Sequence, residues 1–136
     1  MSTWNQIRKK FDIGRSAHEL LNSIDFSFGI ITTKQNKDRV LRIIESIRNQ
    51  NIPYYEIIIV GNTDIKGKDI VTIGFDEKAK KDWITKKKNL IIQNASYENI
   101  VFLHDYFSFS LGWYDGFLEF GNNFNVCMNK ILNYDG

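Results

Sequence analysis

Ionisable and hydrogen-bonding side chains directly follow four apolar, β-favouring segments of the 136-residue sequence. Hydroxyl and amide groups can bind a nucleobase and a ribose, and a carboxylate can hold a hard divalent cation against a diphosphate. The same residue types also favour turns, so ordinary turn chemistry is the alternative interpretation. The four groups are Thr32-Thr33, Asn62 to Asp64, Asp76-Glu77 and His104-Asp105.

Three consecutive lysines, Lys86 to Lys88, fall in the first turns of a helix that we predict at 83–95. Side-chain cations add there to the partial positive charge of the helix dipole, which favours a phosphate. A solvated helix face is the alternative for this run. For His104, the alternative is a core histidine that forms a hydrogen bond with a neighbour.

A parallel sheet is the arrangement that would bring these side chains together. Strands are predicted at 26–31, 56–60, 69–74 and 100–103, and the first two are joined by an amphipathic helix at 37–48. Strand, helix and strand within about 40 residues form a βαβ unit with parallel strands and a right-handed crossover. Ligands of such sheets bind beyond the carboxyl ends of the strands. The predicted fold class is therefore α/β, with a mostly parallel sheet flanked by helices.

Taken in order, these elements resemble the nucleotide-sugar half of a family-2 glycosyltransferase, which has the GT-A fold. In that fold a basic residue and an Asn open a helix, and a short apolar strand delivers a DXD motif. The resemblance covers roughly residues 26–130. The segments that carry it are the strand ending at Thr32-Thr33, residues 56–64, the run WITKKKN at 83–89 and the run IVFLHDY at 100–106.

The resemblance implies a role for each matching residue. Asp105 corresponds to the carboxylate that binds Mn²⁺ or Mg²⁺, and His104 lies near the ribose. Lys88 and Asn89 lie beside the ribose and phosphates of the donor. The remaining implied nucleotide-binding residues are Thr32 and Thr33, which line the nucleobase pocket, Asp76, which faces the base, and Asn62 and Asp64.

Two positions depart from the pattern of the family. His104 and Tyr106 flank a single carboxylate where the family often has two or three, which predicts a lower metal affinity or a mixed His ligand favouring Mn²⁺. Many members also have an acidic residue directly after the second strand, where this chain has Gly61-Asn62.

The function expected from the resemblance is transfer of a hexosyl or deoxyhexosyl group from a UDP-, dTDP- or GDP-linked sugar to an acceptor hydroxyl. The alternative is a non-catalytic α/β module that binds a nucleotide or another protein. We expect an N-terminal arm at 1–24 and a donor-binding domain at 25–136, with the acceptor half missing. No residue is identified as the catalytic base, so we expect the chain alone to be poorly active or inactive.

Composition and charge restrict the partners further. The 18 basic and 16 acidic residues nearly balance, and all but one of the basic residues precede residue 101, which suits a small anion better than a nucleic acid. No apolar run is long enough to cross a bilayer. The single cysteine, Cys127, cannot form an intramolecular disulfide, so a cytoplasmic location is expected.

The last third of the chain is predicted to contain a helix and a strand. Trp113, Phe117 and Phe120 recur at helical spacing, which is more typical of a core-facing stripe than of a platform for an acceptor sugar. Stacking of a sugar on Trp113 or Tyr114 remains the alternative. A final strand is predicted at 125–132.

Overall fold

The computed structural model of the protein describes residues 23–78, 83–121 and 123–133. The predicted strands at 26–31, 56–60, 69–74 and 100–103 are confirmed, as are the predicted helices at 37–48 and 83–95, and their ends shift by at most one residue. In chain order the elements are β1 (Phe26–Ile31), η1 (Lys34–Asn36), α3 (Lys37–Arg48), β2 (Tyr55–Val60), β3 (Ile70–Ile73), α4 (Trp83–Asn94), β4 (Asn99–His104) and α5 (Trp113–Phe120).

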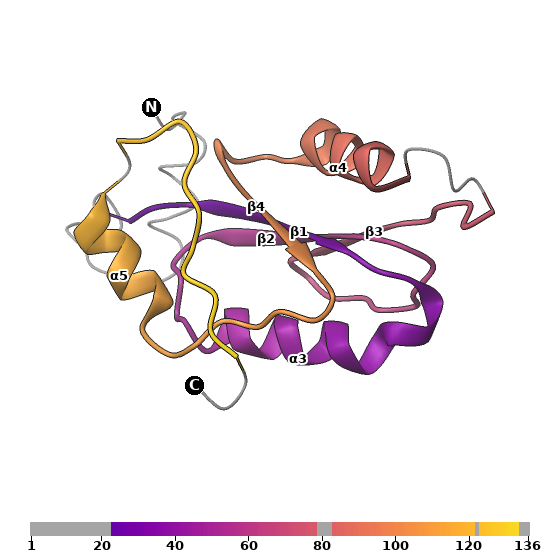
Figure 1. The fold of residues 1–136 in the computed structure, drawn as a ribbon, viewed down its shortest axis with the longest axis horizontal. Helices are drawn as coiled ribbons and strands as arrows, with labels where there is room; N and C mark the ends of the chain where they lie inside the picture. The colour runs from indigo at the N-terminus through magenta and orange to yellow at the C-terminus, as the bar shows by residue number, and fades with distance from the viewer. Residues whose placement is uncertain (1–22, 79–82, 122, 134–136) are drawn as a thin grey trace.

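The four strands form one sheet in the order β3-β2-β1-β4, and each neighbouring pair is parallel. Helix α3 lies on one side of this sheet and α4 on the other (Figure 1). The α/β class with a parallel sheet flanked by helices is therefore confirmed, and the architecture is compatible with a Rossmann-like fold. The direction in which strands are added reverses between β1 and β4, and such a reversal is where ligands of open parallel sheets usually bind.

The face of the sheet that packs against α3 contains the larger core. Phe28 of β1 is fully buried and meets the rings of Tyr55, Phe109 and Trp113. Helix α3 contributes apolar side chains three or four residues apart, which is why one of its sides is buried while its charged side faces solvent. The buried residues of α3 are Val40, Ile43, Ile44 and Ile47.

The opposite face of the sheet packs against α4 through a smaller cluster around Ile31, Ile58, Val60 and Ile91. Gly29 in the middle of β1 permits this contact, because a Cβ atom there would clash with the Cγ2 atom of Ile91. A larger residue at position 29 would separate α4 from the sheet. Helix α4 is also the element that carries the three lysines.

Helix α5 packs beside the amino end of β1. Its residues Trp113 and Phe117 contact the ring of Phe26, as a core-facing stripe requires. The Tyr114 hydroxyl accepts a hydrogen bond from the Ile24 N–H at 3.1 Å and donates one to the Ile24 carbonyl at 3.2 Å. Tyr114 is thus buried and is no platform for a sugar. Phe120, the last member of the predicted stripe, is 64% exposed and does not belong to the core.

The predicted strand at 125–132 is wrong, because residues 123–133 form no strand. The segment runs past α5 instead of pairing with a sheet edge (Figure 1). Only Phe124 and Cys127 pack against the core, while Val126 and Met128 are at least 85% exposed. Local β-propensity was insufficient here since a strand also needs a partner to satisfy its backbone groups.

The predicted N-terminal arm lies outside the described residues, except for Ser23 and Ile24. In the part of the chain that the structure describes, no helix combines the length and the apolar character that crossing a bilayer requires.

Candidate functional site

Asp105 directly follows β4 and is only 8% exposed. Two hydrogen bonds hold its side chain in position. Its Oδ2 atom accepts a hydrogen bond from the Thr32 hydroxyl at 3.0 Å and another from the Asn36 side-chain amide at 2.7 Å. No described residue donates a hydrogen bond to its Oδ1 atom. The carboxylate is therefore oriented through Oδ2.

The strand order explains why these three residues meet. The register pairs Ile31, the last residue of β1, with His104, the last residue of β4, so Thr32 and Asp105 leave the sheet side by side. The short helix η1 then brings Asn36 back over the same rim. Because β1 and β4 are the strands between which the order reverses, the carboxylate stands at the usual ligand position of this architecture.

His104 and Lys88 lie on the side of the sheet that packs against α4. Paired side chains of neighbouring strands share a face, so His104 shares a face with Ile31, which belongs to the cluster under α4. The Lys88 Nζ atom lies 5.6 Å from the ring centre of Phe102, two residues before His104 on that face. Asp105 instead meets Thr32 and Asn36. The residues predicted to bind ribose and phosphate thus approach the rim from one side, and the predicted metal ligand approaches it from the other.

An aromatic pair flanks Asp105. The rings of His104 and Tyr106 are stacked, with centres 5.6 Å apart and an angle of 13° between their planes, and Tyr106 is 65% exposed. The half-buried His104 ring thus has the exposed Tyr106 ring as its stacking partner at the rim.

A depression with a volume of about 500 Å³ lies at the carboxyl ends of β2 and β3. Thr63 is one of its lining residues, and the Thr63 hydroxyl is buried from solvent and has no hydrogen-bond partner among the described residues. A buried hydroxyl without a partner is costly. The depression is lined by Gly61, Asn62, Thr63, Asp64, Ile65, Lys66, Thr72 and Gly74.

Several predicted nucleotide-binding residues already serve the local backbone. The Asn62 amide donates to the Phe75 carbonyl at 2.6 Å and accepts from the Phe75 N–H at 3.0 Å, which ties the end of β2 to the end of β3. Asp76 accepts a hydrogen bond from the Lys78 N–H in an exposed turn.

Thr33 is half-buried, and its hydroxyl bonds to the side chains of Gln35 and Asn36. Asn89 is exposed on α4.

Asp64 forms an exposed ion pair with Lys37, whose Nζ atom lies 2.8 Å from Asp64 Oδ1. The hydrogen bond from Lys37 is the main reason that the pKa of Asp64 is lowered, helped by a backbone hydrogen bond and by the charge of Lys37. Because its side chain is 79% exposed, Asp64 is an accessible carboxylate that lines the depression.

We expect Asp64→Asn to change the melting temperature only slightly near neutral pH, because salt and water screen an exposed pair. A lowered pKa in the folded state stabilises the fold above the unfolded-state pKa, and this contribution is lost as the pH falls through the lowered value. Thermal unfolding of both proteins across this acidic range tests the prediction, since their small difference should vanish in acid. A large difference that persists at high salt would contradict it.

The lysine run does not form a single cationic surface. Lys86 is exposed, whereas Lys87 is completely buried and donates hydrogen bonds to the Thr32 carbonyl at 2.9 Å and to both carboxylate oxygens of Glu77 at 3.0 and 3.2 Å. Two interpretations were predicted for this run, a solvated helix face and a phosphate-binding turn. Lys87 fits neither, because it is buried and bonded to Thr32 and Glu77. Lys88 is partly exposed and lies over the ring of Phe102, two residues before His104.

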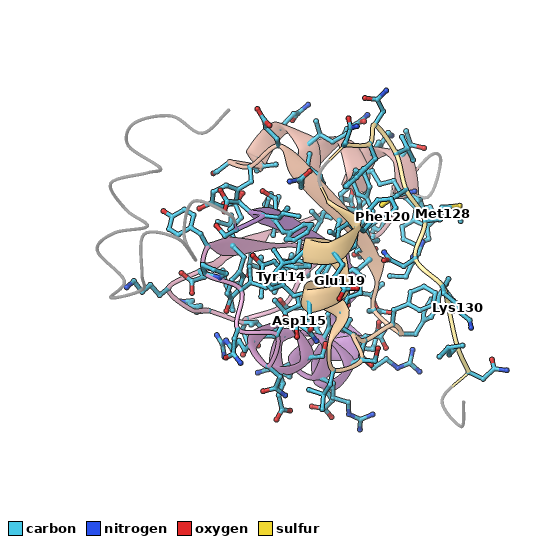
Figure 2. All side chains as sticks on the ribbon, turned by 90° about the vertical axis from the view of Figure 1, so that its left-hand side faces the viewer. Tyr114, Asp115, Glu119, Phe120, Met128 and Lys130 are labelled. Carbon is cyan, nitrogen blue, oxygen red and sulfur yellow. The ribbon has the colours of Figure 1, made fainter. Side chains whose placement is uncertain are left out.

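Asp115 and Glu119, two carboxylates that follow β4 in the sequence, are exposed on the outer side of α5 (Figure 2). Helix α5 packs at the amino end of β1, so both carboxylates are remote from the rim where Asp105 lies. Neither is positioned to assist chemistry beside Asp105.

Sequence reasoning missed Asn36, and it named Glu77 and Lys87 only as members of a strand-end pair and of a lysine run, without their contacts. A signal existed for Asn36, which immediately precedes a predicted helix after the first strand. A weaker signal existed for Lys87, because it lies four residues before Ile91 and therefore on the side of α4 that packs against the sheet. Recognising either contact required knowing which strands are neighbours.

No group of three or more His, Cys, Asp or Glu side chains in residues 23–78, 83–121 and 123–133 is arranged to hold a metal ion by itself. Comparison of the chain with models of protein families, with curated proteins and with solved structures gave no match.

Proposed function

We propose that this chain is the donor-binding part of a glycosyltransferase with the GT-A fold, and that it binds a nucleoside diphosphate sugar at the carboxyl rim of its sheet. The observation that carries the proposal is the Asp105 carboxylate. It is buried at the point where the strand order reverses, oriented by Thr32 and Asn36 through Oδ2, and free of hydrogen bonds from the described residues at Oδ1.

These residues fit a divalent cation that is shared with the ligand. Mg²⁺ is usually held in nucleotide sites by one or two carboxylates together with phosphate oxygens, and Mn²⁺ accepts the same oxygen ligands. Asp105 Oδ1 provides one such oxygen. The described residues contain no group of three or more His, Cys, Asp or Glu that could hold the ion, so the ligand would have to provide further oxygens. Bound there, Mn²⁺ or Mg²⁺ would neutralise negative charge on the departing diphosphate. Metal and nucleotide should therefore bind cooperatively.

The other residues of the rim have roles that follow from their positions. Lys88 and His104, on the α4 side, are suited to the phosphates and the ribose of the donor, with Asn89 on the same helix. The neighbouring depression at the carboxyl ends of β2 and β3, with a volume of about 500 Å³, offers room for the nucleobase. Thr32 and Asn36 keep the Asp105 carboxylate in one orientation, so it need not reorganise when the ligand arrives. In the transferase reaction an acceptor hydroxyl would then attack the anomeric carbon as the diphosphate leaves, and its proton would pass to a base that is not among the residues assigned here.

A non-catalytic α/β module is the second candidate, and one observation favours it. Asn62 and Asp76 both use their side chains for backbone contacts at strand ends, as residues with a purely structural role do. In that case the rim would bind no nucleotide, or would bind one without a metal.

Binding of UDP, dTDP and GDP, each with and without Mn²⁺, separates these candidates. A ligand that binds only the folded state raises its stability by about 2.7 kcal/mol at a hundredfold excess over Kd, which raises the melting temperature by several degrees. We expect one nucleotide to produce this shift and Mn²⁺ to enlarge it, while Mn²⁺ alone has little effect. If none of the three nucleotides stabilises the protein, the proposal is wrong.

A further inference from the structure

Lys87 is a buried cation that the proposed binding of a donor does not use. Its side chain is 0% exposed, and its three N–H donors are matched by the Thr32 carbonyl and by the two oxygens of Glu77. The rings of Phe75 and Trp83 lie 4.9 and 4.8 Å from its Nζ atom. Desolvating an ammonium group is expensive, so a lysine is maintained in such a place only where its contacts offset the cost.

The Thr32 carbonyl that Lys87 binds is confined on another side by Gly61. A Cβ atom at position 61 would lie 2.5 Å from the Thr32 oxygen, so only glycine lets the two backbones come this close. The Thr32 N–H in turn donates to the Val60 carbonyl at 3.0 Å. The backbone of Thr32 is therefore fixed at both of its polar groups, although the residue lies beyond the end of β1.

Thr32 also carries the hydroxyl that orients Asp105. A continuous series of hydrogen bonds thus runs from the Glu77 carboxylate through the Lys87 ammonium and Thr32 to Asp105 Oδ2. It begins on the α4 side of the sheet and ends at the rim.

We infer that Lys87 is a positioning residue, which holds the Thr32 carbonyl so that the Thr32 hydroxyl orients the Asp105 carboxylate toward the bound cation. This inference rests on the proposed function for its role in ligand binding, although the contacts themselves are independent of it. Lys87 does not touch the ligand and acts only through Thr32. A lysine that merely anchors α4 to the sheet would affect stability and leave Asp105 unaffected.

The first measurement follows the side chains of Thr32 and Asp105 in the ligand-free protein. Three-bond NMR couplings report the χ1 angles of both residues in the unaltered chain and in Lys87→Met, which keeps the apolar length of the side chain and removes its charge. We expect one rotamer for each residue in the unaltered chain and averaging over rotamers in Lys87→Met. Unchanged couplings in a folded Lys87→Met protein would overturn the inference, whether or not any nucleotide binds.

The second measurement is the factor by which Mn²⁺ increases the affinity for the nucleotide that binds. Loss of a residue that orients a metal ligand typically costs 10- to 100-fold in metal affinity, so we expect Lys87→Met to lower this factor about tenfold. In a Thr32→Val background, which lacks the hydroxyl, Lys87→Met should lower it no further. An equal loss in both backgrounds would overturn action through Thr32. Lys86→Met, on the same helix but exposed, is the matched control and should leave the factor unchanged.

Gly61→Ala gives an independent test that leaves all four hydrogen-bonding side chains intact, and it decides the matter if Lys87→Met does not fold. The added methyl group would lie 2.5 Å from the Thr32 carbonyl oxygen and 2.8 Å from Thr32 Cγ2, so it must displace the backbone or the side chain of Thr32. We expect the same averaging of the Thr32 χ1 angle and the same direction of change in the Mn²⁺ factor. A single Thr32 rotamer in folded Gly61→Ala would overturn the inference. Absence of nucleotide binding by the unaltered chain would instead count against the proposed function, with the couplings still deciding the role of Lys87.

Discussion

Asp105→Asn is expected to reduce nucleotide affinity in the presence of Mn²⁺ by at least about tenfold, down to the affinity measured without metal. The asparagine side chain has nearly the same shape, and its oxygen can still accept hydrogen bonds from Thr32 and Asn36. Its amide nitrogen, however, would replace Oδ1, the atom that we propose as the ligand of the cation. The loss should therefore be confined to the metal-dependent part of binding, as measured by titration calorimetry with and without Mn²⁺.

Asp115→Asn is the matched control for this prediction. Asp115 is exposed on α5 (Figure 2). Helix α5 packs at the amino end of β1, whereas Asp105 follows the carboxyl end of β4, so the same loss of one charge at Asp115 should not change the affinity. Melting temperatures of both variants near that of the unaltered chain would show that the fold is intact. If Asp105→Asn kept the full increase in affinity with Mn²⁺, the carboxylate could not be the metal ligand.

Phe28→Ala is expected to lower the free energy of unfolding by about 3–5 kcal/mol. Phe28 is 0% exposed, and its ring contacts aromatic side chains from β2, from α5 and from the segment between β4 and α5. Truncation would leave a cavity among large, rigid rings that cannot all move inward to fill it. Since domains are commonly stable by only about 5–15 kcal/mol, the variant should melt at a much lower temperature or fail to fold.

Phe120→Ala removes the same side chain where it is 64% exposed and is the control for this second prediction. Its ring meets only Phe117 and Phe124 among the described aromatic residues, so we expect a far smaller loss of stability. Chemical denaturation measures both losses. Equal losses for the two variants would mean that Phe28 does not belong to the main core.

The strands and helices could be predicted from the sequence because their signals are local. The β-branched run of β2 is buried on both faces, as expected for a central parallel strand, and the apolar residues of α3 recur at the helical period. The same local reasoning was wrong for residues 125–132, whose apolar side chains other than Cys127 remain exposed. An isolated β-favouring segment has no backbone partner, and its sequence does not show whether one will be available.

The candidate site could be predicted only in part. That Thr32 and Asp105 would both end strands was evident from the sequence, whereas Asn36 and Glu77 were not recognised as contacts. Lys87 was grouped with its neighbours, because three successive lysines look alike until the helix is placed on the sheet. A helix turns by about 100° per residue, so adjacent lysines point in different directions and only Lys87 faces the interior.

The sequence by itself determined which segments form the sheet and its covering helices, and which polar groups follow each strand. Only the tertiary structure decided that Asp105 meets Thr32, 73 residues earlier in the chain, and that Lys87 reaches the same residue from the other side. It likewise placed His104 and Lys88 on the α4 side of the sheet, whereas the Asp105 carboxylate lies on the other side. Hydrophobic period and turn chemistry act over a few residues, whereas the neighbours of a parallel strand depend on how the whole chain buries its apolar surface.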